Sequence, residues 1–105
     1  MEQLQYEFAG QRPVKSRAGH ALVGVVGSGN LEVMIEPAKL KGRMRVVVNT
    51  AARGFGAIWQ KVLGDFNERH PLSDVLVSIN DFGATPAVVS LRLDQAVEVF
   101  EGEAP

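Results

Sequence analysis

The fold class is decided by residues 44–79, whose sequence is MRVVVNTAARGFGAIWQKVLGDFNERHPLSDVLVSI. The stretch opens with an apolar run over residues 44–48, which predicts a strand. Apolar residues then recur at helical spacing and predict an amphipathic helix of about four turns with one buried stripe: Phe55, Ile58, Trp59, Val62, Leu63 and Phe66. Pro71 cannot continue that helix, and alternating apolar residues over 75–79 predict a second strand.

On the N-terminal side the pattern is that of strands. Apolar side chains alternate with polar ones over residues 4–8, and apolar runs occupy residues 21–26 and 31–35. Gly27-Ser28-Gly29-Asn30 separates these two runs and predicts a hairpin, because Gly and Asn tolerate a positive φ. The polar, basic stretch 10–19 predicts a loop.

The C-terminal side predicts a second helix. Thr85 followed by Pro86 is a helix start, and apolar residues continue at helical spacing to Phe100. Residues 89–93 also alternate as a strand would, but the start signal and the persistence of the spacing favour a helix. The expectation is a single domain spanning residues 1–105, of class α+β, with a mostly antiparallel sheet of about five strands and two helices packed on it.

Composition limits the chemistry of this chain. It has 105 residues, a net charge of −1 and no Cys, which excludes disulfides, thiolate nucleophiles and cysteine-ligated metals. No apolar run is long enough for a membrane span, and the polar N-terminus does not resemble a signal peptide, so a cytoplasmic protein is expected. Nine of the eleven Lys and Arg lie in residues 1–61, while eight of the twelve acids follow in 62–105. This asymmetry indicates either two solvated faces or two docking surfaces.

Catalytic and nucleic-acid motifs are weak or absent. The two histidines, His20 and His70, are not in ligand-spaced clusters, so no metal site and no catalytic residue is predicted. The sequence Asp-Phe-Gly at 81–83 matches a kinase motif by chance, because the chain is far too short for a kinase. Residues 53–56, Arg-Gly-Phe-Gly, match half of an RNA-binding signature whose other half fails, and Phe55 is expected in the helix core, so RNA binding is disfavoured.

One hydroxyl stands out. Of seven Ser and Thr residues, only Ser28 has glycine on both sides, Gly27 and Gly29, at the predicted crest of a hairpin. Without flanking Cβ atoms, the active site of another enzyme could approach its backbone closely. Serine in a glycine-rich turn is also commonplace, so the pattern alone leaves a purely structural role open.

Two longer strings carry a family resemblance. Residues 23–33, VGVVGSGNLEV, and residues 81–86, DFGATP, resemble the acyl carrier (delta) subunit of bacterial malonate decarboxylase and, more distantly, that of citrate lyase. The resemblance covers nearly the whole chain and is least at residues 10–19 and 37–57. It implies that Ser28 carries phosphoribosyl-dephospho-CoA through a phosphodiester bond, and that the thiol of this group holds acetyl or malonyl as a thioester.

The same resemblance implies a non-catalytic role and a set of partners. These are the acyl-transferase and decarboxylase subunits and the transferase that attaches the prosthetic group, with neither nucleic acid nor membrane among them. A chain without Cys must import the thiol that thioester chemistry requires. The basic residues after the hairpin predict weak, salt-sensitive docking, or else a solvated loop: Lys39, Lys41, Arg43 and Arg45. The alternative function is an unmodified binding module, either RNA-binding or a structural subunit.

Overall fold

The computed structural model describes residues 1–13, the backbone of residues 24–28, and residues 30–102. The elements follow in the order β1 (Glu2–Ala9), β2 (Gly24–Ser28), β3 (Leu31–Pro37), β4 (Arg43–Thr50), α1 (Gly56–Arg69), β5 (Val75–Asp81) and α2 (Pro86–Glu101). The predicted α+β class is confirmed, as are both helices and the strands on which it rests. Of the predicted strand 21–26, the first three residues lie outside the described part of the chain.

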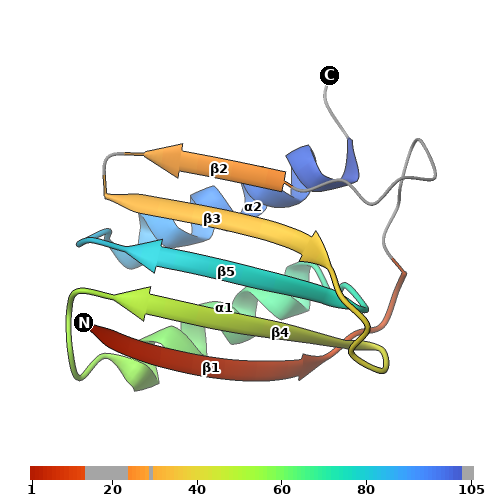
Figure 1. Cartoon of the computed structure of the whole chain (residues 1–105), viewed down its shortest axis with the longest axis horizontal. Helices are drawn as coiled ribbons and strands as arrows, with labels where there is room; N and C mark the ends of the chain where they lie inside the picture. Colours follow the sequence, from red (N-terminus) through yellow and green to blue (C-terminus); the bar gives the residue numbers. More distant parts are fainter. Residues whose placement is uncertain (14–23, 29, 103–105) are drawn as a thin grey trace.

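The strands form one sheet in the order β1-β4-β5-β3-β2 (Figure 1). The pairs β1/β4, β3/β5 and β2/β3 are antiparallel, whereas β4 and β5 are parallel neighbours. The prediction of a mostly antiparallel sheet is therefore confirmed. The parallel pair arises because α1 returns the chain from the end of β4 to the start of β5, the crossover that parallel strands require.

Both helices pack on one face of the sheet, and the other face is uncovered by either of them (Figure 1). The inward positions of β3, β4 and β5 are fully buried, while the alternate positions on the open face are polar or half-exposed. From the helices, the core receives Leu63 and Phe66 of α1 and Leu93, Val97 and Phe100 of α2. The period-two pattern of the strands thus separates a buried face from an accessible one.

The helical stripe of residues 55–66 is only partly buried, which corrects the prediction. Trp59, Leu63 and Phe66 are buried, but Phe55 and Ile58 are 46% and 47% exposed. The helix begins at Gly56, so Phe55 caps it and Ile58 lies in its first turn. There these two side chains border a hollow between the helices rather than the closed core.

The start and end of α2 follow the predicted signals. The Thr85 hydroxyl accepts a hydrogen bond from the Val88 N–H at 3.3 Å, and Pro86 is the first helical residue. The helix ends at Gly102, whose φ of 68° is the left-handed conformation that suits glycine. Val89 and Leu93 are buried whereas Leu91 is 50% exposed, so the alternation at 89–93 is the i, i+4 pattern of a helix face. No helix in the described residues is long and apolar enough to cross a membrane.

Candidate functional site

The serine singled out in the sequence lies at a corner of the sheet. The β2–β3 hairpin closes with Ser28 paired to Leu31. Ser28 is therefore the last residue of β2 and not the crest of the turn, which corrects the prediction. Gly27 pairs with Glu32, whereas Gly29 lies outside the described residues. Because β2 is the last strand in the sheet order, Ser28 occupies the end of an edge strand.

The strand register aligns Ser28 with one row of residues that crosses the whole sheet. Leu31, opposite Ser28, pairs with Asp81 of β5, which is level with Thr50 of β4, which in turn pairs with Glu2 of β1. Neighbouring strands are about 4.8 Å apart, so the backbones of Ser28 and Asp81 are separated by roughly 10 Å. The hairpin and the carboxyl ends of β4 and β5 consequently share one end of the sheet, on the left in Figure 1. We call it the hairpin end.

A hydrogen-bonded turn follows Asp81 and joins the hairpin. Oδ1 of Asp81 accepts the backbone N–H groups of Gly83 and Ala84 at 3.1 and 2.8 Å, and Oδ2 accepts the buried Thr50 hydroxyl at 2.8 Å. The next N–H, that of Phe82, donates to the backbone carbonyl of Asn30 at 2.9 Å. Residues 81–86 therefore act as the predicted turn and helix start, and the turn is tied directly to the β2–β3 hairpin.

Beside this turn lies an apolar pocket of about 220 Å³. Its floor includes Thr50 and Asp81, the residues that share the buried hydrogen bond. One wall comes from the start of α1: Phe55, Ile58, Trp59 and Val62. The opposite wall includes Ala84 and Val89, before and within α2. This pocket was not predicted from the sequence, although an apolar stripe that begins at Phe55, before the first residue of the helix, could have indicated it.

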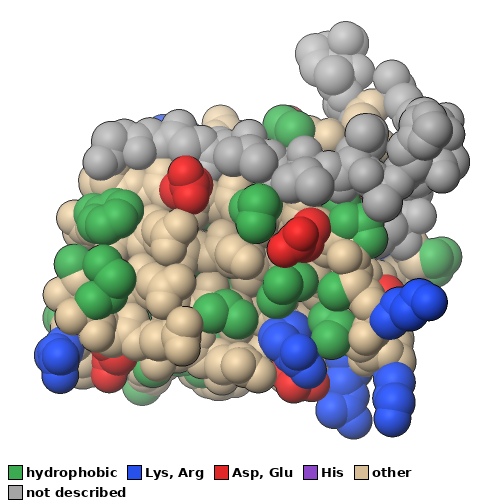
Figure 2. Space-filling view, viewed as in Figure 1, with side chains coloured by type: hydrophobic (Ala, Val, Ile, Leu, Met, Phe, Trp, Pro, Cys, Tyr) green, Lys and Arg blue, Asp and Glu red, His purple; other side chains and the backbone are tan. Residues whose placement is uncertain are grey.

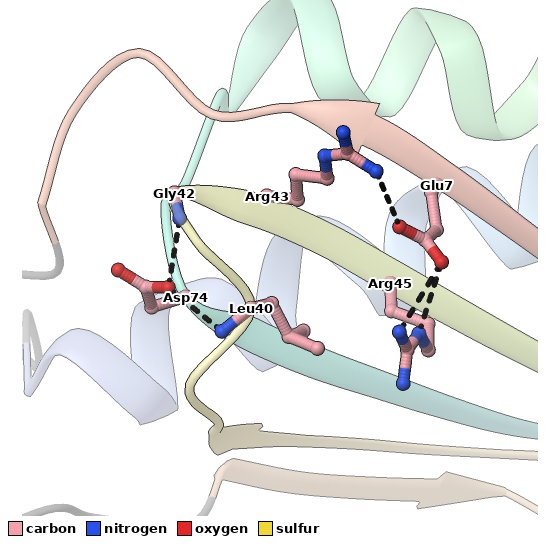
Figure 3. A network of polar contacts seen from close by, with 6 residues as sticks. All are labelled: Glu7, Leu40, Gly42, Arg43, Arg45 and Asp74. Carbon is pink, nitrogen blue, oxygen red and sulfur yellow. Dashed lines mark hydrogen bonds and ion pairs between the residues drawn. The ribbon is translucent and has the colours of Figure 1, made fainter.

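The basic residues expected near the serine lie at the opposite end of the sheet, which corrects that prediction. They follow the far end of β3, and Figure 2 shows Lys and Arg side chains gathered on the right. Arg43 and Arg45 form ion pairs with Glu7 of β1 at 3.3 and 3.2 Å (Figure 3). The hydrogen bond from Arg43 is the main reason that the pKa of Glu7 lies below its usual range. We call this the basic end.

A second carboxylate organises the loop at the basic end. Oδ1 of Asp74 accepts the backbone N–H groups of Leu40 and Gly42, each at 2.9 Å (Figure 3). These hydrogen bonds, that from Gly42 first, lower the pKa of Asp74. Nearby, Arg12 forms a bidentate ion pair with Glu101 at 2.7 and 3.1 Å, which links the chain after β1 to the end of α2. These contacts maintain the structure of the basic end.

The remaining candidates from the sequence have structural surroundings. His70 follows α1, and its Nε2 lies 3.0 Å from Oδ1 of Asp94 on α2; His20 is outside the described residues. Arg53 and Gly54 precede α1 in a turn, so the partial RNA-binding signature is not on a strand. Within the described residues, no group of three or more metal-ligating side chains comes together.

The structure therefore defines a small α+β domain whose glycine-flanked serine lies at the end of an edge strand. The family model described as malonate decarboxylase delta subunit (MdcD) matches residues 18–100. The chain belongs to this family.

Curated relatives and a solved structure agree with that membership. The malonate decarboxylase acyl carrier protein of Xanthomonas euvesicatoria pv. vesicatoria is 65% identical, and the match covers 97% of each chain. That of Burkholderia cepacia is 62% identical over 91% of this chain and 87% of the relative. A chain in the crystal structure of a Pseudomonas malonate decarboxylase hetero-tetramer in complex with malonate is 35% identical, with a TM-score of 0.75, covering 93% of this chain and 97% of the other.

Proposed function

We propose that Ser28 is the residue through which this chain holds its acyl group. Membership of the family makes the chain an acyl carrier subunit of malonate decarboxylase. The proposed linkage is a phosphodiester bond from the Ser28 hydroxyl to phosphoribosyl-dephospho-CoA, with Gly27 and Gly29 flanking the attachment point. The observation that carries the proposal is the position of Ser28 at the closing pair of a hairpin, at the end of an edge strand.

This corner of the sheet fits a bulky covalent group. Among the described residues, β2 pairs with β3 alone, so no strand borders its outer edge. Gly27 precedes the serine without a Cβ, and Asn30 in the turn is exposed. A modifying enzyme can therefore approach the backbone from beyond the hairpin while the paired strand keeps the serine in a defined position.

The chain holds and presents the acyl group, and other subunits transform it. When bound, the prosthetic group supplies the thiol that a chain without Cys lacks. We assign acyl exchange and decarboxylation to separate transferase and decarboxylase subunits in the cytoplasm, with residues 1–105 as one carrier domain. A purified, malonyl-loaded chain should therefore release no carbon dioxide on its own; release at the rate of the assembled enzyme would contradict a non-catalytic role.

The attachment is tested by intact mass and peptide mapping after co-expression with the modifying enzymes. The wild type and the matched control Ser78→Ala, a serine of β5, should each gain a single adduct, whereas Ser28→Ala should gain none. Because the change lies at the end of an edge strand, the free energy of unfolding should move by no more than about 0.5 kcal/mol. An adduct on Ser28→Ala would refute the attachment site. A wild type without any adduct would support an unmodified binding module instead.

A further inference from the structure

We infer that the pocket between α1 and α2 holds the uncharged end of the prosthetic group attached to Ser28, which we call the arm. We also infer that the pocket excludes this end when it is malonylated and therefore carries a carboxylate. The inference rests on the proposed attachment at Ser28 and adds a second site within the same chain. The occupant is the thiol or acetyl end of the chain's own prosthetic group.

The pocket lies within reach of the serine. Asp81, on its floor, is in the same register row as Ser28 and two strand spacings away, roughly 10 Å. The turn that forms part of its rim is hydrogen-bonded to the hairpin through Phe82 and Asn30. Phe82 is itself 58% exposed, so the turn that joins the hairpin to the pocket carries an exposed apolar side chain. An extended phosphopantetheine chain is long enough to span this separation.

The size and lining of the pocket suit the end of such an arm. A volume of about 220 Å³ corresponds to about seven water molecules at roughly 30 Å³ each. Sites for drug-sized ligands are larger, about 300–1,000 Å³, so the pocket suits a thioester end and not the nucleotide part of the group. Its walls are aliphatic and aromatic, and Phe55 and Ile58 at its border are each nearly half exposed. Covering these surfaces with a neutral group would remove apolar area from water.

The polar groups of the floor select against a negative charge. The Asp81 side chain already accepts three hydrogen bonds, from Thr50, Gly83 and Ala84, so both of its oxygens are engaged by donors of the chain itself. No Lys, Arg or His is among the described residues that line the pocket. A malonyl carboxylate would therefore lose its hydration without gaining a cationic partner and would lie beside another acid. The acetyl end can stay in the pocket, whereas the malonyl end remains in solvent, accessible to a partner subunit.

The first experiment measures access to the arm's thiol. The chain has no Cys, so a thiol reagent reports only on the prosthetic group. Ala84→Phe fills the pocket, and Ala87→Phe adds the same side chain at an exposed position of α2 outside it. After mass spectrometry verifies the adduct, the wild type and Ala87→Phe should react several-fold more slowly than Ala84→Phe. Equal rates for all three proteins would overturn the inference while leaving the attachment at Ser28 intact.

A second variant pair keeps the test decisive if Ala84→Phe does not fold. Ala52→Phe fills the pocket from the end of β4, and Ala51→Phe is its exposed neighbour outside the lining. The thiol of Ala52→Phe should react several-fold faster than that of Ala51→Phe. A thiol equally slow in both would place the protected arm elsewhere and refute the inference.

The second experiment tests the discrimination by charge through Trp59, the single tryptophan of the chain and a wall of the pocket. The fluorescence of the acetyl-loaded protein should differ from that of Ser28→Ala, which carries no arm. The malonyl-loaded protein should resemble Ser28→Ala. The same spectral change with acetyl and malonyl would refute the exclusion, and no change with either would refute occupancy of the pocket.

Discussion

The two ends of the sheet differ in how side chains complete them. At the basic end, ion pairs and side-chain-to-backbone hydrogen bonds join strands and loops, with Glu7, Asp74 and Glu101 as acceptors. At the hairpin end, one buried carboxylate organises a turn beside an apolar hollow, and three apolar side chains remain substantially exposed: Phe55, Ile58 and Phe82. At the basic end, polar contacts join the strands and loops to one another, whereas the hairpin end has an exposed apolar surface near Ser28.

This difference indicates that the two ends of the domain have different roles. Exposed apolar side chains that border a pocket cost solubility and add little to the core, so their concentration at one end indicates binding. The register row from Ser28 to Asp81 brings the proposed attachment point and the pocket to that same end. The basic end lies a full strand length away from the pocket. The contacts that its described residues make serve to maintain the structure.

The largest effect is expected from breaking the bidentate ion pair at the basic end. Arg12→Met removes the bidentate ion pair to the Glu101 carboxylate, whose side chain is 1% exposed. Arg12 itself is about one-third exposed, so the expected loss is about 2–3 kcal/mol, below the 3–5 kcal/mol typical of fully buried pairs. Urea denaturation measures it. The matched control Arg53→Met, at the exposed turn before α1, should stay within about 0.5 kcal/mol of the wild type. Equal effects of the two variants would contradict the structural role of the basic end.

A smaller loss is expected at the hairpin end from the single buried carboxylate. Asp81→Ala removes the acceptor of the Thr50 hydroxyl and of two backbone N–H groups, which should lower the free energy of unfolding by about 2 kcal/mol. Asp81→Asn keeps one side-chain oxygen for the backbone groups and should lose less. Thermal unfolding and Trp59 fluorescence together report stability and pocket shape. An Asp81→Ala protein as stable as the wild type would mean that the turn forms without this carboxylate.

The smallest effect is a dependence of stability on pH that arises at the basic end. The pKa values of Glu7 and Asp74 are lowered from ordinary values of 4.5 and 3.8. Their ionised forms therefore stabilise the folded chain above those values, and this contribution is lost as the pH falls through the lowered pKa values. Asp74→Asn should flatten the stability profile below about pH 3.8, and Asn tolerates the positive φ of 59° at this position. Asp65→Asn on α1 is the control. A steeper profile in Asp74→Asn would contradict the assigned direction.

Local periodicity was sufficient to predict most of the fold. Alternation in β1 and β5, the apolar run in β3 and helical spacing in α1 and α2 are properties of neighbouring residues, so the sequence determined which segments form each element. The Thr85-Pro86 start also follows from local hydrogen bonding and proline geometry. The same reasoning failed for Phe55 and Ile58, because periodicity identifies an apolar face without showing whether another element covers it.

The sequence by itself determined the elements, the glycine-flanked serine and the absence of cysteine, because these depend on residue identity and short-range spacing. Only the tertiary structure decided that β5 lies between β4 and β3 and that Ser28 shares a row with Asp81. It also decided that the residues between β3 and β4 lie at the opposite end from the hairpin. Strand order and register depend on which faces are buried together across the whole chain, and that collective choice is not encoded in any one local pattern.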